Sequence, residues 1–138
     1  MVRNEHVRVL LSKAAQDEQA LDILLSDSNA PLAVMGFLAQ QATEKLLKAA
    51  LKLVGADYPF THVIDRLIDL LEQAGAGVPS EVNALSVLTP FAADLRYEIL
   101  PEGHETALDV ASARRLVSEL RAWVERLAQD RDIDLSAP

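Results

Sequence analysis

Phe37-Leu-Ala-Gln-Gln-Ala-Thr-Glu-Lys-Leu-Leu-Lys-Ala-Ala-Leu51 is the stretch that decides the fold class of this chain. Its apolar residues recur at helical spacing and cover a wide face, whereas its polar residues lie together on one side. That polar stripe consists of Gln41, Glu44, Lys45, Lys48 and Lys52. Three ammonium groups on one helix face can hold a phosphate or a carboxylate. The alternative is a solvated face, on which an i,i+4 ion pair of Glu44 with Lys48 contributes about 0.3–0.5 kcal/mol.

The composition favours a single helical domain. The chain has 138 residues, of which 50% are hydrophobic and only 4% are aromatic. This length suits one domain, and a core made mainly of Leu, Ala, Val and Ile favours packed helices over a β-sandwich. The chain contains no cysteine, which excludes disulfides, cysteine-based zinc sites and a thiol nucleophile.

The charge and the hydropathy pattern restrict the partners. The net charge of −8 opposes binding of the whole surface to nucleic acid, so an RNA site would have to be a local basic one. No DNA-binding motif is present. No charged leader with an apolar core and no apolar run of about 18 residues is found, so we expect a cytoplasmic protein without a membrane partner.

The apolar spacing predicts five amphipathic helices on short loops, and it shows no strand pattern. We expect the helices at about residues 5–26, 32–54, 62–74, 80–99 and 106–128. Thr61 is the expected N-cap of the third helix, Gly55 and Gly75 are expected helix ends, and Pro90 should kink or break the fourth helix. The pattern predicts an all-α fold with an antiparallel four-helix-bundle core and a fifth helix. The domain would cover residues 3–128, followed by a flexible tail at residues 129–138.

Four motifs resemble the HEPN domains of prokaryotes. The segment quoted above resembles the signature of their second helix, and it is the most specific of the four. The others are Ala15-Gln-Asp17 followed by Ala20, Tyr58-Pro-Phe-Thr-His62 followed by Leu67, and the stretch from Phe91 to the Arg96-Tyr97 pair. Their order and approximate spacing also agree with the family, so the resemblance covers nearly the whole chain.

This resemblance implies a helical bundle that forms a homodimer, with a site in a cleft at or near the dimer interface. It also implies a small nucleotidyltransferase as a partner, often in a toxin–antitoxin pair. Some members are metal-independent ribonucleases, whereas others are proposed only to bind nucleotides.

The chain departs from the family pattern at three positions. Leu38 stands where the family often has His, and Glu98 stands where a proline often follows the Arg-Tyr pair. The family's ribonuclease signature is an Arg followed by four to six residues and then a His. Here seven residues separate Arg96 from His104, which puts the ribonuclease activity in question.

Arg96 and His104 are nevertheless the candidate catalytic residues. RNA cleavage without a metal needs a base for the ribose 2′-hydroxyl and a cation for the charge that builds on phosphorus. His104 has the titration range of a base, and Arg96 offers a bidentate fork to phosphate oxygens. Alternatively, Arg96 neutralises Asp17 or Glu18 inside the bundle, and His104 is an ordinary loop residue.

The candidate nucleotide-binding residues are Lys45, Lys48, Arg96, Tyr97 and His62. Arg96 beside an aromatic residue is a good anion receptor, and the two lysines would complete a basic pocket. His62 could bind a phosphate at the start of the third helix, or it could make only a local hydrogen bond. Asp17 and Gln41 would orient the binding side chains.

No cofactor or metal is expected, because the three histidines lack metal-ligand spacing and no nucleotide-binding glycine loop occurs. We therefore carry three hypotheses. The first is a homodimeric module that binds nucleotide or RNA and is paired with a nucleotidyltransferase. The second is a metal-independent endoribonuclease that uses Arg96 and His104. The third is a helical interaction module without a ligand.

Overall fold

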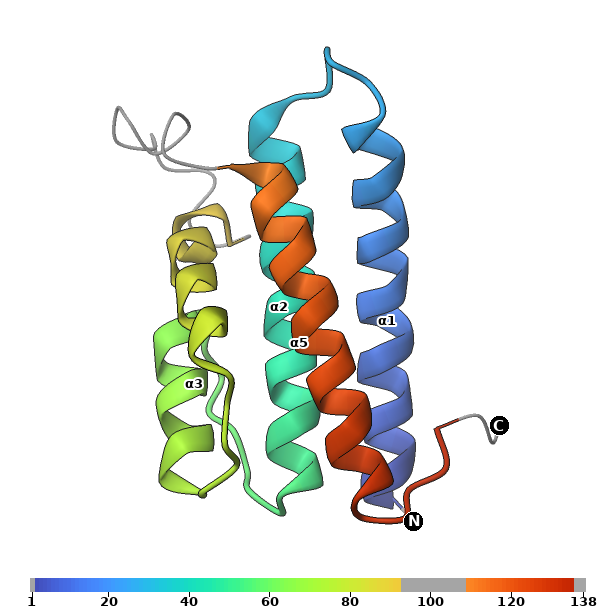
Figure 1. Cartoon of the computed structure of the whole chain (residues 1–138), viewed down its shortest axis with the longest axis vertical. Coiled ribbons are helices and arrows are strands. Elements are labelled where there is room, and N and C mark those ends of the chain that lie inside the picture. The colour runs from blue at the N-terminus through green and yellow to red at the C-terminus, as the bar shows by residue number, and fades with distance from the viewer. Residues whose placement is uncertain (1, 93–108, 136–138) are drawn as a thin grey trace.

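The computed structural model of the chain describes residues 2–92 and 109–135 (Figure 1). These residues form α1 (Val2–Leu25), α2 (Leu32–Leu53), α3 (Ile64–Gln73), the 3-10 helix η1 (Ser80–Phe91) and α5 (Val110–Gln129). Every regular element in the described part of the chain is helical, which confirms the predicted all-α class.

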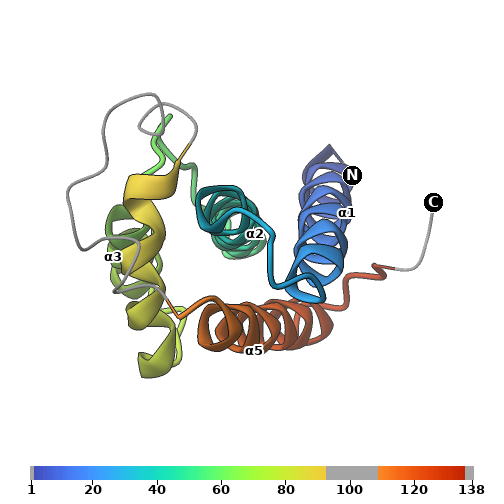
Figure 2. The same cartoon turned by 90° about the horizontal axis from the view of Figure 1, so that it is seen from above.

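Helix α2 is the centre of the bundle. Figure 2 shows α1 on one side of it, the pair of α3 and η1 on the other, and α5 lying across α1 and α2. Contacts along the chain show that α1 runs antiparallel to α5, because Arg114 bonds to Asp22 near the end of α1 and Arg8 bonds to Asp134 beyond α5. The connection after α2 runs back along that helix, since His62 lies beside Glu44 in its middle.

Small buried residues let the neighbouring helices approach α2 closely. Ala39, Ala42, Ala49 and Ala50 are all fully buried in the core. At Gly36 the approach is closest, because a Cβ built there would lie 2.4 Å from the ring of Phe91. Phe91 is itself buried at the end of η1, so the ring has little room to move.

The helix ends agree with the sequence in some places and differ in others. Gly55 and Gly75 adopt positive φ values of 77° and 72° directly after α2 and α3, as predicted. Thr61, however, does not cap α3, which begins after Val63. The hydroxyl of Thr89 in η1 instead accepts a hydrogen bond from the Ile64 N–H at 3.2 Å, so the cap comes from another helix.

The fourth helix is also of a different type from the one predicted. Residues 80–91 form a 3-10 helix instead of an α-helix with a kink at Pro90. The i→i+3 pattern ends immediately after this proline, where the Ala92 N–H donates to the Thr89 carbonyl at 3.0 Å. Residues 93–99 of the predicted helix lie outside the described residues, and so do residues 106–108. Helix α5 begins at Val110, where the Asp109 side chain accepts from the Ser112 N–H.

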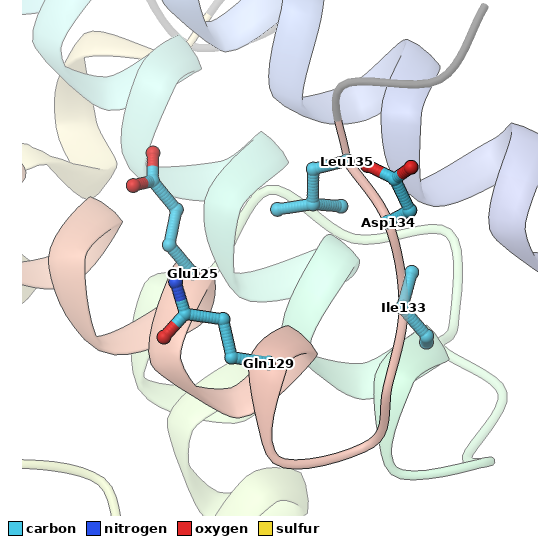
Figure 3. Close-up of a pocket in the computed structure, with 5 residues that line it drawn as sticks. All are labelled: Glu125, Gln129, Ile133, Asp134 and Leu135. Atoms are coloured by element: carbon cyan, nitrogen blue, oxygen red, sulfur yellow. The ribbon is translucent and has the colours of Figure 1, made fainter.

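The chain continues to contact the bundle after α5. Asp132 has a positive φ of 55°, and the Ile133 N–H donates to the Ala128 carbonyl at 3.0 Å, so the chain turns back towards α1. Figure 3 shows Leu135 pointing towards α5, where it lines an open pocket of about 440 Å³ with Glu125 and Gln129. Packing thus extends past residue 128, and the flexibility of residues 129–138 stays a prediction.

Gly36→Ala tests the close approach of α2 and η1. Alanine is a better helix former than glycine by about 1 kcal/mol, so helix propensity alone predicts a more stable protein. The clash with Phe91 predicts the opposite, a loss of about 1–3 kcal/mol in the free energy of unfolding. Urea unfolding measures the sign. Combining Gly36→Ala with Phe91→Leu should cost less than the sum of the two single changes, and a stabilised Gly36→Ala protein would contradict the packing described here.

Candidate functional site on helix α2

Glu44 lies at the centre of a polar network on α2. Its carboxylate is only 6% exposed, and it accepts three hydrogen bonds. The Gln40 amide donates to Oε1 at 3.0 Å, the Lys48 ammonium donates to Oε2 at 3.0 Å, and His62 Nδ1 lies 2.7 Å from Oε1. Gln40 also donates to the His62 carbonyl at 3.4 Å, so the connection after α2 is attached to the helix at two atoms.

The ionisation of Glu44 follows from these contacts. Burial alone would raise the pKa of its carboxyl, because a low-dielectric environment disfavours the charged form. The hydrogen bonds from His62, Gln40 and Lys48 outweigh burial and lower the pKa below its usual value. Glu44 is therefore a carboxylate at neutral pH, and it provides negative charge for Lys48.

Lys45 joins this network to α1. Its ammonium lies 2.5 Å from Asp17 Oδ2 on α1 and 3.4 Å from Gln41 Oε1 on its own helix. Gln41 then donates to Gln40 Oε1 at 2.7 Å, and Gln40 donates to Glu44. A single chain of hydrogen bonds thus runs from α1 across the face of α2 to the connection that leads to α3.

Tyr58 forms the other end of the site. Its hydroxyl lies 2.9 Å from His6 Nε2 on α1. The ammonium groups of Lys48 and Lys52 lie 5.2 and 5.4 Å from the centre of its ring, within the range of cation–π attraction. Lys52 also pairs with Asp57 at 3.3 Å, and the Asp57 side chain is fully exposed. One aromatic ring therefore lies beside two lysines of the predicted stripe.

Five of the predicted site residues come together in this network, namely Asp17, Gln41, Lys45, Lys48 and His62. The predicted i,i+4 ion pair of Glu44 with Lys48 is present at 3.0 Å, but the face is not fully solvated, because the side chains of Lys45 and Lys48 are only 21% and 12% exposed. Arg96, Tyr97 and His104 lie outside the described residues. The basic pocket that would include Arg96 and Tyr97, and the catalytic pair of Arg96 and His104, therefore stay predictions.

The sequence analysis missed the partner of Glu18. This carboxylate is 5% exposed and binds the guanidinium of Arg121 in α5, with the shortest contact at 2.5 Å. Arg114 also reaches it at 3.4 Å and pairs with Asp22 at 2.6 Å. Burial by itself would lower the pKa of Arg121, but its hydrogen bonds with Glu18 raise it.

The alternative role of Arg96, neutralising Asp17 or Glu18, falls on a residue outside the described ranges and stays a prediction. In the described structure Asp17 pairs with Lys45, and Glu18 pairs with Arg121 and Arg114. Two arginines seven residues apart, at positions 114 and 121, were the sequence signal for a second cationic face, since that spacing puts both on one side of a helix.

The described residues hold neither a candidate metal cluster nor a candidate membrane span. Residues 2–92 and 109–135 contain no group of three His, Asp or Glu side chains placed to hold a metal ion. Within the same ranges, no helix has the combination of length and apolar character that a membrane span requires.

The described structure places the protein in the class of helical bundles, here with a polar network on the central helix. Comparison with known families identifies it further, because the model of the HEPN domain matches residues 7–127. The chain belongs to the HEPN family. No curated protein and no solved structure gave a significant match.

Glu44→Gln tests the central role of the carboxylate. We expect the free energy of unfolding at pH 7 to fall by about 1–3 kcal/mol, because Lys48 and His62 lose a charged acceptor. The pKa of Glu44 is lower in the folded chain, so its stabilisation is present above the unfolded pKa of about 4.3 and is lost as the pH falls through the folded value. The difference between wild type and variant should therefore shrink below about pH 4.

The matched control is Glu72→Gln, at an exposed position of α3. Urea titrations of the three proteins between pH 3 and 7 make the comparison. Equal losses for the two variants at every pH would contradict the assignment of Glu44 as the centre of the network.

Proposed function

We propose that this HEPN protein binds nucleotide or RNA through the lysine face of α2. One observation supports this most directly. In a chain with a net charge of −8, Lys45, Lys48 and Lys52 lie on one helix face and are mostly buried. Burying ammonium groups is costly, and the carboxylates beside them offset this cost. Each ammonium has three N–H donors, and the described ion pairs use one donor of Lys48 and one of Lys52.

We further propose that the protein works as a cytoplasmic homodimer paired with a nucleotidyltransferase, in the manner of a toxin–antitoxin pair. Members of this family often dimerise. The side of α2 that carries the lysines continues with Val34, which is 41% exposed and lies seven residues before Gln41 on the same face. A two-fold contact at this face of α2 would bring the lysines of two copies together.

Lys52→Gln is the sharpest test of binding. The Asp57 partner is fully exposed, so this change should leave the stability within about 0.5 kcal/mol of wild type. If phosphate contacts Lys52, the variant binds labelled RNA more weakly, and the slope of log K against log salt falls by about one. Fluorescence anisotropy at several salt concentrations measures both quantities, with a mononucleotide titrated in parallel.

Lys13→Gln is the control, because Lys13 lies at an exposed position of α1. An unchanged salt slope for Lys52→Gln, or a wild-type protein that binds neither RNA nor nucleotide, would contradict the proposed function. Light scattering at the same protein concentrations gives the mass of the particle. A mass of one chain would remove the homodimer from the proposal.

The alternative function is a metal-independent endoribonuclease with Arg96 and His104 as the catalytic pair. Membership of a family whose domains are often ribonuclease-like supports this alternative. Incubating labelled RNA with the wild type, Arg96→Ala and His104→Ala proteins in EDTA tests it. We expect cleavage by the wild type alone if the pair is catalytic, with a loss of about 100-fold or more in each variant. RNA that stays intact with the wild type would leave binding as the function.

A further inference from the structure

Phe60 exposes its aromatic ring almost completely. It lies in the connection between α2 and α3, and its side chain is 97% exposed. Full burial of a Phe side chain would contribute about 1.5–3 kcal/mol, and this ring forgoes that gain. Single exposed apolar residues are common on proteins, so exposure alone assigns no role to Phe60. The surroundings of the ring give the further information.

The residues on both sides of Phe60 are attached to the bundle. Tyr58 bonds to His6 on α1, and His62 bonds to Glu44 on α2. The ring of Phe60 lies 6.0 Å from the His62 ring at an interplanar angle of 65°, an edge-to-face contact that leaves the Phe60 side chain exposed. A ligand that stacks on Phe60 therefore meets a ring in a connection that is already ordered, which reduces the entropic cost of binding.

Through His62, the Phe60 ring lies beside the polar network that contains Lys48. Glu44 connects His62 to Lys48, and Lys48 and Lys52 both lie over the ring of Tyr58. Exposed aromatic rings beside a basic groove are the combination by which proteins bind single-stranded nucleic acid, because bases stack on the rings and phosphates pair with the cations. In a duplex the bases are stacked on one another, and their faces are not available to such a ring.

We propose that Phe60 stacks on an unpaired base of single-stranded RNA whose phosphates contact Lys48 and Lys52. This inference rests on the proposed RNA binding and deepens it by naming the ligand as single-stranded. A second copy of the chain is the other possible partner of the ring. The surroundings of Phe60 favour RNA, because its neighbour His62 bonds to Glu44, which also holds Lys48, and lysines are depleted in the cores of protein interfaces.

Three substitutions of Phe60 separate stacking from simple apolar contact. Phe60→Ala removes the ring, Phe60→Leu keeps an apolar side chain of similar size without a π-face, and Phe60→Trp enlarges the π-face. Anisotropy with labelled single-stranded RNA should show affinities about 5- to 100-fold lower for the Ala and Leu variants and no loss for the Trp variant. Val63→Ala, at a neighbouring residue that is 44% exposed, should bind like wild type.

The Trp variant adds a direct signal. The natural chain has one tryptophan, Trp123, which is only 8% exposed, so quenching by RNA in the variant and not in the wild type would report stacking at position 60. Equal affinities of wild type, Phe60→Ala and Phe60→Leu would overturn the stacking proposal and leave RNA binding intact. A wild type that binds a nucleotide but not RNA would overturn the stacking proposal alone, whereas a wild type that binds neither would overturn both proposals.

Light scattering detects the competing partner. If Phe60→Ala and Phe60→Leu convert a two-chain particle into single chains, the ring belongs to the contact between copies, and the stacking proposal is overturned. An unchanged mass together with weaker binding of single-stranded RNA supports it. A double-stranded RNA of the same length is the matched ligand, and the Ala variant should bind it as the wild type does.

Discussion

The rest of the structure depends on the buried carboxylate of Glu44. A charge inside a helical bundle is stable only when donors surround it, and α2 alone provides two of them, Gln40 and Lys48. The third contact comes from His62, eighteen residues further along the chain. Because this contact holds His62 against the middle of α2, the connection must run back along the helix before α3 begins. Along that path Tyr58 contacts His6 on α1 and Phe60 is exposed, and α3 then packs beside α2.

A second buried carboxylate, Glu18, joins two helices on the other side of the bundle. Glu18 joins α1 to α5 through Arg121, and Arg121 also donates to the Leu11 carbonyl at 3.0 Å. The core between these helices is made mostly of aliphatic side chains, which pack closely but accept more than one arrangement. Ion pairs are directional, and we interpret these two as the contacts that select one register for the bundle. Their net contribution to stability is small by comparison, because desolvation cancels much of the attraction.

The sequence predicts most of the fold and only part of the site. Helices α1 and α2 follow from apolar spacing, and Gly55 and Gly75 mark helix ends because their φ values favour glycine. Spacing does not distinguish a 3-10 helix from an α-helix around Pro90, so the prediction of an α-helix over residues 80–91 is wrong in helix type. The apolar spacing of a sequence does not predict which residues far apart in the chain come into contact. The cap from Thr89 and the bond of Tyr58 to His6 depend on which helices are neighbours, and so does the choice of Arg121 as the partner of Glu18.

The three lysines of the stripe differ in how firmly their carboxylates hold them. Lys45 binds Asp17 on another helix at 2.5 Å, with both side chains about one-fifth exposed, so an incoming phosphate would have to break a contact between α1 and α2. Lys52 binds a carboxylate that is fully exposed, and an ion pair of that kind contributes little, so a phosphate can replace Asp57 at small cost. Lys48 is intermediate in how easily a phosphate could replace its partner. That partner, Glu44, lies on the same helix and is buried, so it stays beside Lys48 when a ligand binds. Anion binding on α2 should therefore be strongest at the end nearest Tyr58, and Lys45 should serve mainly to join the helices.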